Sequence, residues 1–110
     1  MRVIISEAVE RQINIVFEYG TQTFGKRTAE RLRKSIYLQI KRLTEHPRIG
    51  HREFLLEGHV VVYRSLVVHK HYKVIYHIDE EKQILYIVAL WDTRRNPASL
   101  VHAVITQHNK

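Results

Sequence analysis

The chain has 110 residues, enough for one domain over residues 1–110, and its 45% apolar content with four glycines and two prolines excludes a disordered or collagen-like chain. Eighteen basic against eleven acidic residues give a net charge of +7, which indicates an anionic partner: nucleic acid, an acidic protein or a membrane surface. The absence of cysteine excludes disulfides, cysteine-ligated metals and thiol nucleophiles. No apolar run approaches the ~20 residues of a membrane span, so we expect a soluble cytoplasmic protein.

The first elements along the chain are a short strand and an amphipathic helix. Val3, Ile4 and Ile5 form a β-branched run that predicts a strand. Ser6 is a suitable N-cap for a helix whose core positions recur at helical spacing, namely Val9, Ile13, Val16 and Phe17. Gly20 is a natural stop for this helix.

A second helix is the clearest pattern in the sequence. Its apolar stripe steps by three or four residues through Ala29, Leu32, Ile36, Ile40 and Leu43. We expect it to begin between Thr23 and Lys26 and to end before Pro47, because the residue preceding proline avoids helical angles. The short linker from Gly20 to Gly25 then predicts an antiparallel helical hairpin.

The second half of the chain changes to strand patterns. Val60 to Val68, Tyr72 to Ile78 and Ile84 to Trp91 are rich in β-formers, and residues 79–82 suit a hairpin loop. The last of these runs is apolar on both parities, as in a strand covered on both faces, and a short helix is expected from Pro97. The sequence therefore predicts an α+β fold with an N-terminal strand, a two-helix hairpin on a mainly antiparallel sheet of about four strands, and a short C-terminal helix.

The sequence holds few signatures of catalysis or metal binding. It has no phosphate-cradling glycine loop and no nucleophile elbow. His69 and His71 are two residues apart in an extended region and could hold a metal, but a third ligand is not evident and exposed strand histidines are the simpler interpretation. We expect neither a metal nor a cofactor.

Basic residues at strand positions are the more informative group. Arg64, Lys70 and Lys73 lie on or beside the predicted strands, and Arg94-Arg95 follows the last strand. A rigid sheet that brings Arg64, Lys73 and Arg94 together would hold a phosphodiester backbone, with guanidinium forks on phosphate oxygens. Pairing with acidic side chains of a protein partner, or unlinked surface charges, explains the same pattern.

Several short motifs follow one another in a fixed order along nearly the whole chain, from Val3 to about Ile105. They are Phe24-Gly25 with Ala29, Leu43-x-x-x-Pro47-x-x-Gly50, Tyr63-Arg64-Ser65-Leu66, Tyr72-Lys73-Val74-Ile75-Tyr76-x-Ile78, Ile84-Leu85-Tyr86-Ile87-Val88 and Arg94-Arg95-Asn96-Pro97-x-x-Leu100. In this order and spacing they resemble the RelE/ParE superfamily of toxins from bacterial type II toxin–antitoxin modules. The resemblance implies a growth-inhibiting toxin of a plasmid-stabilisation module, neutralised by a cognate antitoxin with an acidic, amphipathic C-terminal segment.

The two branches of this superfamily imply different activities. The RelE-like branch cleaves messenger RNA on the ribosome; here it would use Arg64, Lys73 and Arg94 on the phosphate and His71 or His102 for proton transfer. That branch has an arginine where Lys73 stands and an aromatic residue where Leu100 stands, and this chain has no tyrosine beyond Tyr86. The ParE-like branch is associated with blocking DNA gyrase, and the missing tyrosine favours it. In either case Arg64, Lys70, Lys73, Arg94 and Arg95 are the expected target contacts, and no membrane partner is expected.

Overall fold

The structure, a computed structural model, describes residues 1–108 and the side chains of residues 1–105. Its helical elements are α1 (Glu7–Phe24), α2 (Lys26–Arg42), the 3₁₀ turn η1 (Phe54–Leu56) and α3 (Pro97–His108). Its strands are β1 (Arg2–Ile5), β2 (His51–Arg52), β3 (Arg64–His69), β4 (Tyr72–Asp79) and β5 (Ile84–Asp92). This order confirms the predicted α+β fold.

The five strands form one mixed sheet in the order β1-β5-β4-β3-β2. The β2–β3, β3–β4 and β4–β5 pairs are antiparallel, whereas β1 is parallel to β5, with Arg2 opposite Ile84 and Ile5 opposite Ile87. The parallel pair places the first residues of the chain beside the last strand of the sheet. The sheet has one strand more than expected, since the sequence analysis did not find the two-residue β2.

The helical hairpin begins at a capping residue, Ser6, and turns at a glycine, Gly25. The hydroxyl of Ser6 accepts the Val9 N–H at 3.2 Å, so Ser6 caps α1 as predicted. The expected stop at Gly20 is wrong: α1 continues to Phe24, and Gly25 alone joins it to α2 with φ at +93°. Gly20 is instead buried against α2, where an added Cβ would lie 3.4 Å from the Ala29 Cβ. The glycine that ends α1 is therefore the one that adopts a positive φ.

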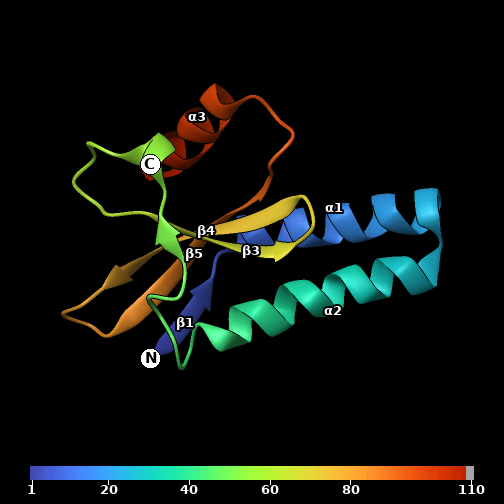
Figure 1. The fold of residues 1–110 in the computed structure, drawn as a ribbon, viewed down its shortest axis with the longest axis horizontal. Helices are drawn as coiled ribbons and strands as arrows, with labels where there is room; N and C mark the ends of the chain where they lie inside the picture. Colours follow the sequence, from blue (N-terminus) through green and yellow to red (C-terminus); the bar gives the residue numbers. More distant parts are fainter. Residues whose placement is uncertain (109–110) are drawn as a thin grey trace.

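Helices cover both faces of the sheet (Figure 1). One core, between the sheet and the hairpin, contains Val9, Ile13, Ile36, Ile40, Leu43, Val68, Val74, Tyr76, Leu85, Ile87 and Leu90. The other, between the sheet and α3, contains Leu56, Tyr63, Ile75, Ala89, Trp91, Leu100 and Val104. β5 contributes to both cores, which explains why its sequence is apolar on both parities.

The segment between α2 and β3 departs most from the expectation. The strand predicted from Val60 begins only at Arg64, and residues 60–63 form an irregular connection after η1. Val60 and Val62 are β-formers by type, yet both side chains are exposed. Tyr63 is buried in the α3-side core, so residue 63 anchors the connection.

Candidate interaction site

Arg64 lies at the start of β3 and supports the turn at Gly50. Its Nη1 donates to the Gly50 carbonyl at 2.8 Å, and the Gly50 N–H donates to the Tyr76 hydroxyl at 3.0 Å. Tyr76 is fully buried opposite Arg64, and burial raises the pKa of its hydroxyl. The Arg64 guanidinium is thus attached to the chain leading into β2.

Lys73 lies on the other face of the sheet. Its Nζ forms an ion pair with Glu53, whose residue is only 5% exposed. The Glu53 N–H in turn donates to the Tyr63 carbonyl at 2.9 Å. The pair therefore fastens the η1 segment to β4 on the α3 side.

Arg94 and Arg95 follow β5 and have separate partners. The Nε and Nη2 groups of Arg94 donate to the two carboxylate oxygens of Asp92 at 2.9 and 2.8 Å. These hydrogen bonds hold the pKa of the Asp92 carboxyl below its usual value. Asp92 also adds to the effect of burial in raising the pKa of Tyr72. The Arg95 guanidinium stacks 4.6 Å from the centroid of the Trp91 ring.

The expected convergence of Arg64, Lys73 and Arg94 is therefore wrong. Arg64 pairs with Tyr76, and Tyr76 and Lys73 are three residues apart on β4, so they point to opposite faces. Arg94 follows Asp92, which pairs with Tyr72 at the other end of β4, about 13 Å along the strand from Tyr76. The alternation and register of the strands separate the three cations.

The remaining predicted site residues also lie apart. Lys70 is exposed in the β3–β4 turn, and the backbone carbonyl of His71 accepts from Thr93 at 2.7 Å. His102 is exposed on α3. Neither histidine shares a site with Arg64.

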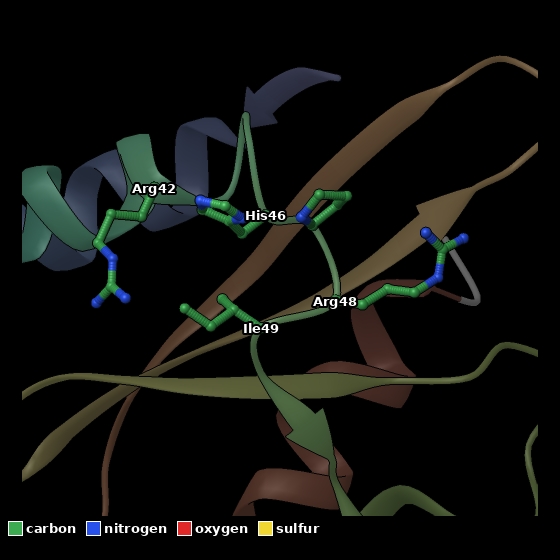
Figure 2. Close-up of a pocket in the computed structure, with 5 residues that line it drawn as sticks. Arg42, His46, Arg48 and Ile49 are labelled. Carbon is green, nitrogen blue, oxygen red and sulfur yellow. The ribbon is translucent and has the colours of Figure 1, made fainter.

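Two hollows border the Arg64 end of the sheet. One, of about 540 Å³, has Arg64 and His77 in its lining and an Arg48–Glu80 ion pair at its rim. His77 stacks on Tyr86 with ring centroids 5.2 Å apart. The other lies at the end of α2, where Figure 2 shows the guanidinium groups of Arg42 and Arg48 pointing away from each other, with His46 and Ile49 between them. Arg48 and Arg64 both line the first hollow, and their guanidinium groups are engaged by the Glu80 carboxylate and the Gly50 carbonyl.

The surface best suited to a protein partner is a groove between α1 and the ends of β4 and β5. This α1–β5 groove has a volume of about 430 Å³ and is lined by Ile15, Val16, Tyr19, Tyr72, Leu90, Arg94 and Arg95, among others. Ile15 and Tyr19 are 64% and 59% exposed, so large apolar side chains lie open beside two arginines.

The β5 backbone in this groove is only partly paired. β1 ends at Ile5, opposite Ile87, so the later residues of β5 have no strand on this side. The Leu90 N–H donates instead to the Gln12 side-chain oxygen at 3.0 Å. The sequence analysis missed the groove, although Ile15 and Tyr19 lie four residues apart and off the predicted core stripe of α1.

The sequence matches the family described as "ParE toxin of type II toxin-antitoxin system, parDE" over residues 3–97. That match covers most of the chain. The chain belongs to the ParE toxin family. Among solved structures, the toxin resembles "Chromosomal ParDE TA system from P. aeruginosa" with a TM-score of 0.70 and 13% identity, covering 84% of this chain and 95% of that one. No curated protein matches its sequence.

The family match spans the hairpin and all of the sheet except Arg2, and it ends where α3 begins at Pro97. The α1–β5 groove thus lies within the matched region. Among the side chains that the structure describes, those of residues 1–105, there is no group of three or more histidine, aspartate or glutamate residues placed to hold a metal ion. No helix in the described part of the chain is long and apolar enough to cross a membrane.

Proposed function

We propose that this ParE-family toxin inhibits growth by binding DNA gyrase in the cytoplasm and that its cognate antitoxin neutralises it. The separation of Arg64, Lys73 and Arg94 is the observation that favours binding over cleavage. Lys73 is half-buried and paired with the buried Glu53, and Arg94 is bound to Asp92 on the hairpin side. Binding without cleavage needs only a surface of complementary shape and charge. A dispersed set of cations can supply that charge.

Cleavage by a RelE-like mechanism makes stricter demands on geometry. Internal attack by a ribose hydroxyl requires a base for that hydroxyl, an acid for the leaving oxygen and cations that stabilise the charge between them. His71 and His102 lie in the β3–β4 turn and on α3, away from Arg64. The arrangement therefore favours the ParE-like activity over the alternative of a ribosome-dependent endoribonuclease.

The antitoxin segment proposed to fit the α1–β5 groove is amphipathic and acidic. Its apolar side chains would cover Ile15 and Tyr19, which are open to solvent in the described structure. Its carboxylates would pair with Arg94 and Arg95 at the end of the groove. Lys70, Arg94 and Arg95 keep exposed charges and are the predicted cations that we retain as partner contacts.

Expression of the toxin alone and together with the antitoxin from the adjacent reading frame tests this function. We expect the toxin alone to arrest growth and break DNA while transcripts stay intact, and the antitoxin to relieve both effects. Purified toxin should also block supercoiling by gyrase. Transcripts cut on the ribosome with intact DNA would contradict the proposal.

The double variant E53M/K73M separates the two activities. It removes the buried ion pair as a unit, so no charge is left uncompensated in the protein interior. A gyrase-binding toxin should remain toxic with this change, whereas a nuclease that needs Lys73 on the phosphate should lose its activity. The exposed variant K82M serves as the control for the loss of one lysine.

A further inference from the structure

Nearly all of the net charge of the toxin lies on one helix. α2 contains seven basic residues and one acidic residue, Glu30, so it accounts for six of the seven net positive charges. The rest of the chain is almost balanced. Among the residues that the structure describes, the ion pairs involve arginines and a lysine outside α2 and none within it.

Four of the six exposed cations of α2 form a straight line along the helix. Arg27, Arg31, Lys34 and Lys41, with Leu38 between the last two, are spaced by four, three, four and three residues and are all exposed. This spacing places them on one face of the helix, opposite the buried Ala29, Ile36 and Ile40. We call these four cations the basic ridge. It is about 21 Å long at the helical rise per residue.

The basic ridge faces away from the rest of the molecule. Figure 1 shows α1 and the sheet on one side of α2 and no other element on its outer side. Arg33, which lies off the ridge, is engaged 4.0 Å above the Phe17 ring, where it helps to join the two helices. The ridge cations are thus displayed on a rigid helix and are not used to hold the fold together.

We propose that the basic ridge binds the phosphate backbone of duplex DNA without sequence preference. Its length spans about six phosphates of one strand along the duplex axis, at one charge per ~3.4 Å. A protein partner would bury apolar surface, and the ridge offers only Leu38, whereas the apolar surface lies in the α1–β5 groove. A row of cations with little apolar area matches a phosphate backbone better than an acidic peptide. This site is separate from the groove assigned to the antitoxin, and it does not depend on the identity of the target.

Fluorescence anisotropy with the purified toxin and short labelled duplexes of unrelated sequences tests the proposal. With four phosphate contacts, the affinity should fall about 150-fold for a fourfold rise in salt, with a slope near −3.6 on logarithmic axes. The variant R31Q/K34Q should lower that loss to about 12-fold, because two contacts are removed. Glutamine is a good helix former, so α2 should persist, and circular dichroism would verify it.

The variant R27Q/K41Q tests the ridge from its ends and should reduce the salt slope by a similar amount. The matched control R2Q/K82Q removes the same charge from exposed positions outside α2 and should leave the slope unchanged. An equal loss in the control would show a non-specific effect of net charge and overturn the proposal. It is also overturned if the unmodified toxin does not bind duplexes at low salt, or if polyglutamate of equal charge competes as well as DNA. Gyrase is absent from this assay, so a failure of the toxin to bind DNA would overturn the basic-ridge proposal and leave the proposed inhibition of gyrase standing.

Discussion

At the scale of single residues, the ion pair between Lys73 and the buried Glu53 joins η1 to the sheet and should contribute to stability. Removing Lys73 leaves the Glu53 carboxylate, whose residue is only 5% exposed, without its cation, which costs about 3 kcal/mol or more. We therefore expect K73M, which leaves the buried Glu53 carboxylate unpaired, to lower the free energy of unfolding by about that amount, whereas E53M/K73M should lose much less. Urea denaturation of the toxin and both variants measures this. Equal losses in the single and double variants would show that the pair is not coupled.

Gly50 is a second residue whose identity is fixed by its surroundings. An added Cβ would meet the Ser65 carbonyl and lie 2.7 Å from the Tyr76 hydroxyl, so G50A must displace backbone or a buried tyrosine. We expect a loss of about 2 kcal/mol in the free energy of unfolding. G20A is the matched control, because its Cβ would make only ordinary contact with Ala29 and alanine favours a helix. Thermal unfolding measures both variants. Equal melting temperatures for G50A and G20A would contradict the close packing around Gly50.

At the scale of elements, the hairpin is held by polar contacts as well as by its core. The Tyr37 hydroxyl of α2 donates to the Glu10 carboxylate of α1 at 2.7 Å. Burial, then this hydrogen bond, raises the pKa of Tyr37 from 10.0 to about 12. Because the folded-state pKa is raised, the stabilisation is fully present below the unfolded pKa and is lost as the pH rises from 10.0 to about 12.

The variant Y37F should therefore be less stable than the unmodified toxin by about 1 kcal/mol near neutral pH. The gap should close progressively above pH 10.0, because Tyr37 ionises in the unfolded chain while the folded protein, with its pKa raised to about 12, still holds the proton. Denaturation midpoints between neutral pH and about pH 11 measure this change. A gap that stays constant over that range would contradict the assignment. Y19F, at an exposed position of α1, is the matched control for the loss of one tyrosine hydroxyl.

Element types were predictable because both periodicities are strong in this sequence. The helical stripe from Ala29 to Leu43 and the alternation from Tyr72 to Ile78 each depend on local burial alone. The end of α1 was not predictable in the same way, because Gly20 and Gly25 look alike until the packing against Ala29 is known. β2 is too short to give a periodic signal, and it exists only because β3 lies beside it.

The arrangement of the site required information that the sequence does not carry locally. Arg64 and Lys73 both lie on strands as predicted, but the register between β3 and β4 decides the face on which each one points. The partner of Lys73, Glu53, comes from a segment with no regular pattern. The groove residues are also distant in sequence, since α1 meets the ends of β4 and β5 only in the folded molecule.

At the scale of the whole molecule, the toxin has two different exposed surfaces. Antitoxin binding should depend on the apolar α1–β5 groove and not on the basic ridge of α2. We expect I15D to weaken the antitoxin complex by more than about 100-fold, because a charge would be buried against an apolar segment. Titration calorimetry measures the affinity, and L38D on the ridge is the matched control. Equal weakening by L38D would place the antitoxin elsewhere.

The parallel pairing of β1 with β5 has a consequence for how the toxin is made. β1 leaves the ribosome before the other strands of the sheet, but its hydrogen-bonding partners are residues 84–87. β1 therefore lacks its partner strand until β5 has been made, while the hairpin that follows it can already form from local contacts. The sheet cannot be completed before β5 is made, so a nascent chain that stops before β5 carries the hairpin without a closed sheet edge.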